Sequence, residues 1–89
     1  MENYKKTALQ CMENIIAMKM ADGMEKRDAV LAIKKEMAHA KGPLHLGAEY
    51  KDAFDAIQKG ENCTLDGAFV SLKLLFREKY NDYSTAWKE

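Results

Sequence analysis

Apolar residues recur at intervals of three and four along most of the chain, a spacing typical of helices with one buried face. Four segments carry it, at 4–21, 26–40, 47–59 and 65–80. Alternation of apolar and polar residues is confined to one short stretch between the second and third segments, 44–50, and this is too little to indicate a sheet. The sequence therefore predicts an all-α chain.

Turn-forming and capping residues separate the four segments. Gly23 follows the first segment and Gly42-Pro43 follows the second, and glycine readily adopts the left-handed conformation that ends many helices. Gly60 is expected to end the third segment, and Thr64 is expected to cap the fourth with its hydroxyl.

The two halves of the chain resemble each other at an offset of 39 residues. Apolar positions then coincide, since Ile15 falls on Phe54 and Ile33 falls on Leu72. Each half consists of a helix, a turn and a capped helix, so we predict a compact four-helix domain built from two αα-hairpins. The tail after residue 80 is expected to add a short fifth helix, with Tyr83 as one of its packing anchors.

The segment at 65–80 has more apolar residues than one buried stripe requires. The stripe is complete without Val70 and Leu74, which lie on its flank. Met18 and Met20 raise the same question in the first segment, because side chains two residues apart on a helix point to different sides. We expect a second copy or another protein to cover this excess. The predicted interaction surface consists of Met18, Met20, Val70, Leu74, Arg77 and Glu78. In a homodimer, Arg77 and Glu78 are expected to pair across the rim of the contact.

Length and charge narrow the classes of protein. The 89 residues suit one domain, 1–89, and 14 basic side chains balance 14 acidic ones. A neutral chain has no general attraction to nucleic acid or anionic lipid. The longest apolar run, 29–33, is far below the roughly 20 residues of a membrane span, and no secretory signal is visible. We expect a soluble, cytoplasmic protein without a membrane partner, with Cys11 and Cys63 reduced and buried.

The sequence contains no motif for catalysis or metal binding. The side chains that could bind zinc through sulfur or nitrogen are Cys11, His39, His45 and Cys63. They are separated by 28, 6 and 18 residues, whereas zinc ligands usually occur in pairs a few residues apart. There is no nucleophile elbow and no glycine-rich phosphate loop. We therefore predict a non-enzymatic protein with no metal and no cofactor.

These exclusions favour a non-catalytic protein-interaction module, an adaptor or inhibitor that self-associates. Its small size suits an accessory protein of a phage or mobile element, of the anti-defence type. The alternative is a small-ligand or nucleotide binder with a pocket at an oligomer seam. That pocket would lie in the connection between the second and third segments, where glycines and a proline flank a histidine between leucines. The predicted pocket residues are Gly42, His45, Gly47 and Tyr50.

A second alternative is a nucleic-acid binder that acts through the second segment. A basic side, diluted by acidic residues, is formed there by Arg27, Lys34, Lys35, His39, Lys41 and His45. The turn at Gly42 resembles that of a helix-turn-helix, but Lys51 falls where the motif needs an apolar residue. We therefore do not expect nucleic acid to be the partner.

Overall fold

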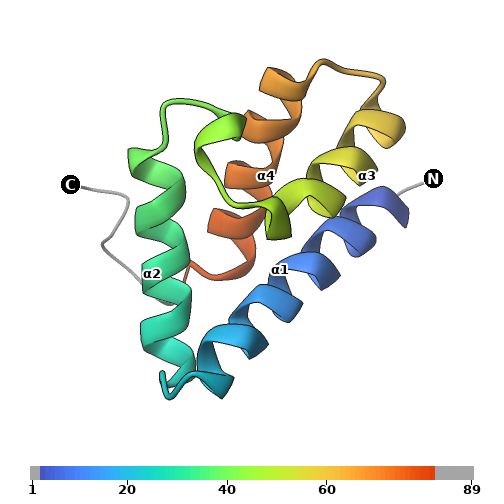
Figure 1. Ribbon diagram of the computed structural model, residues 1–89. Helices are drawn as coiled ribbons and strands as arrows, with labels where there is room; N and C mark the ends of the chain where they lie inside the picture. The colour runs from blue at the N-terminus through green and yellow to red at the C-terminus, as the bar shows by residue number, and fades with distance from the viewer. Residues whose placement is uncertain (1–2, 82–89) are drawn as a thin grey trace.

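A computed structural model describes residues 3–81 (Figure 1). In this part of the chain the fold is all-α and has no strand, as predicted. The helices are α1 (Asn3–Ala21), α2 (Lys26–His39), α3 (Lys51–Glu61) and α4 (Leu65–Lys79), with single 3-10 turns η1 (Pro43–His45) and η2 (Ala48–Tyr50) between α2 and α3. The predicted fifth helix, with Tyr83, lies outside the described residues.

The four helices form two hairpins, and each helix also contacts a helix of the other hairpin. α1 and α2 make the first hairpin, and α3 and α4 make the second (Figure 1). α1 runs antiparallel to α3, so the Tyr4 hydroxyl donates to the Glu61 carboxylate over 3.0 Å. α2 runs antiparallel to α4, and the Lys34 Nζ donates to the Tyr80 carbonyl oxygen over 2.7 Å. Each helix therefore contacts more than its sequence neighbour.

One hydrophobic core lies between the helices. It draws residues from all four of them, and most of its large side chains have no exposed surface. Phe54 of α3 meets the edge of the Phe69 ring of α4, with centroids 6.3 Å apart. The fully buried large side chains are Tyr50, Lys34, Phe76, Met12, Ile33, Met37, Ile57, Leu72 and Val30. Apart from Lys34, these are the positions that the three-and-four spacing selects.

Most helix ends follow the predicted capping chemistry. Gly23 has a φ of 110°, which places it in the left-handed region after α1. The Thr64 hydroxyl accepts a hydrogen bond from the Gly67 amide over 3.1 Å and so caps α4. The prediction for the third segment was wrong at both ends, because α3 begins only at Lys51 and ends beyond Gly60. Its left-handed terminal residue is Asn62, with a φ of 53°.

Gly60 is a contact residue within α3 and not a helix terminator. A Cβ built on Gly60 would lie 2.1 Å from Cγ of Tyr4 and 2.5 Å from its Cβ. These Tyr4 atoms are next to the α1 backbone, so a side-chain rotation would not relieve the overlap. Glycine here lets α1 and α3 approach closely, and the Glu61 carboxylate then joins Tyr4 of α1 to Ser71 of α4.

The second helices of the two hairpins match at the predicted offset. α2 begins at Lys26 and α4 begins at Leu65, 39 residues later. At this offset Ile33 matches Leu72 and Met37 matches Phe76, and all four have no exposed surface. The two helices therefore present corresponding faces to the core, which makes α2 an internal reference for α4.

We predict that Gly60→Ala lowers the free energy of unfolding by about 1–3 kcal/mol, the usual effect of overpacking. Alanine favours helix over glycine, so the loss would occur against the local preference. Gly42→Ala is the matched control, since nothing lies within 4 Å of a Cβ there. Urea denaturation of both variants measures the difference, and equal stability of Gly60→Ala and wild type would contradict the close α1–α3 contact.

Candidate interaction surface

The outer side of α4 carries apolar residues that no other part of residues 3–81 covers. Val70 is 51% exposed and Leu74 is 58% exposed, four residues apart on one face of the helix. Exposed charged side chains lie at either end of this pair. We call this surface the outer α4 face and define it as Asp66, Val70, Leu74, Arg77 and Glu78.

The core side of α4 fixes which way this face points. Ala68, Leu72 and Phe76 are fully buried, and a helix turns by about 100° per residue, so Val70 and Leu74 lie on the opposite side. The sequence placed them on a flank of the buried stripe, but they lie farther around the helix than that. They can be covered from outside without any change in the core.

α2 shows that the fold does not require an apolar residue at the position of Leu74. In the register that aligns the buried residues of α2 and α4, Lys35 of α2 matches Leu74 of α4. Lys35 is exposed, as expected for the outward side of a surface helix. Leu74 therefore departs from the pattern of its structural counterpart, and packing among residues 3–81 does not account for it.

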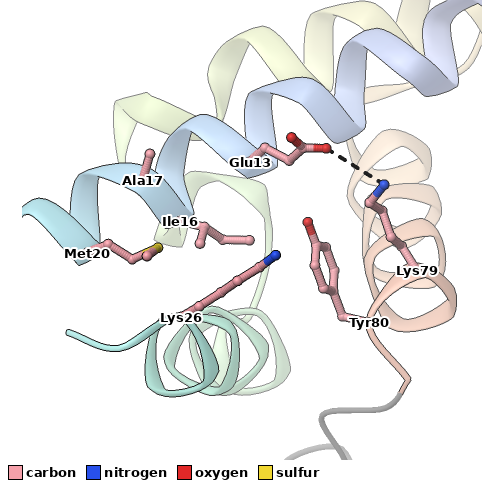
Figure 2. A pocket seen from close by; sticks show the side chains of 7 residues that line it. All are labelled: Glu13, Ile16, Ala17, Met20, Lys26, Lys79 and Tyr80. Carbon is pink, nitrogen blue, oxygen red and sulfur yellow. Dashed lines mark ion pairs between the residues drawn. The ribbon is translucent and has the colours of Figure 1, made fainter.

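Of the two methionines in the predicted surface, Met20 belongs to a different part of the molecule from the outer α4 face. Met18 is 56% exposed and Met20 is 44% exposed, on opposite flanks of α1. Met20 instead lines a depression of about 400 Å³ between α1, the start of α2 and the end of α4 (Figure 2). Neither Val70 nor Leu74 lines that depression. The six predicted residues therefore do not form one continuous patch.

Sequence reasoning did not find the depression beside Met20. Its apolar wall is formed by α1, and Figure 2 shows the ammonium groups of Lys26 and Lys79 and the hydroxyl of Tyr80 reaching into it. Lys79 also pairs with Glu13 of α1, at 3.7 Å. These side chains come from three helices and lie far apart in the sequence, so no local motif signals the site.

The predicted ligand pocket differs from the depression that the structure shows near the same connection. A hollow of about 300 Å³ lies there, but only Gly47 of the four predicted residues lines it. His45 is exposed, and Gly42 has open space around it. The hollow is mainly apolar, with contributions from Pro43, Leu44, Leu46, Phe54 and Leu65. The three-and-four spacing predicts core positions for Phe54 and Leu65, and this pattern does not indicate a pocket.

Tyr50 has a structural role and is not available for stacking on a ligand. Its side chain is 1% exposed, and its hydroxyl donates to Glu36 Oε1 over 2.6 Å. The second oxygen of Glu36 pairs with Lys19 over 3.1 Å, so one carboxylate ties η2 to α2 and α1. Burial, followed by the hydrogen bond and charge of Glu36 and the charge of Glu49, raises the pKa of Tyr50.

Lys34 was predicted to lie on an exposed basic side, and this prediction was wrong. The side chain is 1% exposed and reaches the C-terminal end of α4. Burial, and then the nearby Arg77 charge, lowers the pKa of Lys34. The four-carbon stem of a lysine packs like an apolar side chain, which explains how it fits between helices.

The helix-turn-helix comparison also fails on geometry. α2 and α3 are separated by residues 40–50, which include two 3-10 turns, and α3 packs mainly on α1 and α4. A recognition helix would instead follow α2 after a turn of three or four residues.

The thiols and imidazoles remain apart in the described chain. Cys11 and Cys63 are free and half-buried, more open than expected. Burial, and then the charge of Asp52, raises the pKa of Cys11, which lowers its thiolate fraction and its nucleophilicity. Within residues 3–81, no three side chains of histidine, cysteine, aspartate or glutamate gather as a metal site would require.

Comparison with known protein families, curated proteins and solved structures finds no match to this chain. Among the described helices, none has both the length and the apolar content needed to cross a membrane.

We predict that Tyr50→Phe lowers the free energy of unfolding by about 1 kcal/mol at pH 7, because one hydrogen bond to a carboxylate is lost. The raised pKa adds a pH dependence. Below about pH 10 the phenol is protonated in both the folded and unfolded states, so its contribution is complete. At higher pH the unfolded phenol ionises first and wild-type stability falls.

Urea denaturation at neutral pH and near pH 11 tests this prediction. The difference between wild type and Tyr50→Phe should shrink on the alkaline side, and tyrosinate absorbance should follow unfolding for one of the tyrosines. A difference that stays constant across this pH range would contradict the role given to the Tyr50 hydroxyl.

Proposed function

We propose that this chain is a non-catalytic protein-interaction module and that the outer α4 face is its contact surface. The observation that carries the proposal is the exposure of Val70 and Leu74 on the side of α4 opposite the core. Apolar side chains grouped on one face and bordered by charged residues are a recurring feature of protein contact sites.

The energetic gain from covering this pair is moderate. Full burial of a valine or leucine side chain contributes about 1.5–3 kcal/mol. Val70 and Leu74 are 51% and 58% exposed, so roughly half of that value remains to be gained at each. A contact of this size suits an adaptor or inhibitor that associates reversibly. A role as a phage or mobile-element accessory protein, and a cytoplasmic location with both thiols reduced, belong to the same proposal.

Site-specific photo-cross-linking tests the surface. A benzophenone amino acid at position 70 should give a covalent adduct with a protein in the cells that naturally produce the chain, and Leu74→Glu should abolish that adduct. The same amino acid at position 35 is the control, because Lys35 is exposed at the corresponding side of α2.

Circular dichroism should show the same helix content for Leu74→Glu as for wild type, because Leu74 does not contribute to the core. Equal cross-linking at positions 70 and 35, or an adduct that survives Leu74→Glu, would refute the assignment of this face.

A second candidate function is small-ligand binding in the hollow beside η1. The observation in its favour is the apolar lining, and Leu44 at its edge is 86% exposed. Such a hollow suits a small apolar group, with Lys51, Asp55 and Gln58 as polar contacts at the rim.

We predict that a ligand of this kind raises the melting temperature of the wild type in a metabolite and nucleotide panel, by mass action. Ala48→Phe, which fills the hollow, should abolish the shift. Gln10→Phe on the exposed side of α1 is the control and should retain it. An absence of any shift at millimolar ligand would eliminate this second candidate.

A further inference from the structure

The partner of the outer α4 face follows from the order of charges along it. Val70 and Leu74 lie about 6 Å apart along the helix axis, with residue 72 midway between them. Asp66 lies about 9 Å before this midpoint and Arg77 about 7.5 Å after it. An acidic and a basic side chain are thus placed almost symmetrically about the centre of the apolar pair.

The two charged residues also share one flank of α4. At about 100° per residue, Asp66 and Arg77 fall within about 20° of each other around the helix axis. Glu78 falls on the opposite flank, about 100° away from Arg77. Lys73 points back toward the bundle, where its ammonium lies 4.5 Å from the centroid of the Phe69 ring.

A second copy of the same helix pairs both Asp66 and Arg77 only in the antiparallel direction. A twofold axis that passes between the two helices, perpendicular to both, sets them antiparallel. It places the same flank of each copy together. Val70 of each copy then packs on Leu74 of the other. Asp66 of each copy lies beside Arg77 of the other, which makes two charge pairs. A parallel twofold pair would instead bring opposite flanks together, which places Arg77 beside Glu78 of the other copy and leaves Asp66 without a basic partner.

We infer that the outer α4 face binds a second copy of this chain as an antiparallel twofold pair centred near residue 72. The inference depends on the proposed contact surface. It requires a shallow crossing of about 20°, as in helical bundles, to keep the two charge pairs in reach. Arg77 pairs with Asp66 and not with Glu78, because pairing of Arg77 with Glu78 would centre the contact beyond the apolar residues.

Charge reversal in single and mixed samples tests the inference. Sedimentation velocity at high micromolar concentration should show a dimer for wild type. Asp66→Lys and Arg77→Glu should each weaken the dimer by about tenfold, since each change places two like-charged pairs at the rim. An equimolar mixture of the two variants should restore the dimer, because one chain then carries two basic residues and the other two acidic ones.

The mixture also separates this effect from a change in folding. Asp66→Lys removes an acidic residue from the first turn of α4 and so affects helix stability, but adding a different variant chain would not repair that. Lys35→Glu, a charge reversal on α2, is the control and should leave the dimer unchanged.

A wild type that stays monomeric overturns the second copy as the partner. Cross-linking at position 70 then still decides whether the face binds another protein, so the two proposals fail separately. A wild-type dimer that both variants leave intact, or a mixture that does not recover it, overturns the antiparallel register.

Discussion

A bundle of four helices can bury only one face of each helix, and this constraint governs the molecule. The core takes one apolar stripe from each helix and leaves the remaining side of each in contact with solvent. On α2 that side is charged or polar at the position of Lys35, as expected. On α4 the matching position is Leu74. Because the core is already complete without it, packing within residues 3–81 does not account for its apolar character.

The same constraint explains how much of the fold was predictable. Burial at Ile33, Leu72 and Phe76 follows from their spacing alone, and the Thr64 cap follows from local backbone chemistry. Gly60 was misinterpreted because its role depends on Tyr4, 56 residues earlier in the chain. A sequence pattern reports local preferences, whereas a close helix–helix contact depends on residues that only the tertiary structure brings together.

The candidate sites show the same division. Val70 and Leu74 could be identified from the sequence of a single helix, because their spacing places them outside its buried apolar stripe. The hollow beside η1 and the depression near Met20 each draw side chains from several elements, so the residues expected to form a pocket were mostly wrong. Tyr50 was the most misleading, because an aromatic residue in a glycine-rich connection suggests a binding loop. Its hydroxyl instead anchors that connection through Glu36.

The polar anchors give the outer α4 face a stable platform. Lys34 holds the end of α4 against α2, and Glu61 joins Ser71 of α4 to Tyr4 of α1. α4 is therefore tied at its middle and its end to other helices, while Val70 and Leu74 face outward. A contact surface on a fixed helix loses little conformational entropy on binding, because its backbone is already ordered. In the association that we propose, this preorganisation would let two small apolar side chains contribute more than they would on a mobile segment.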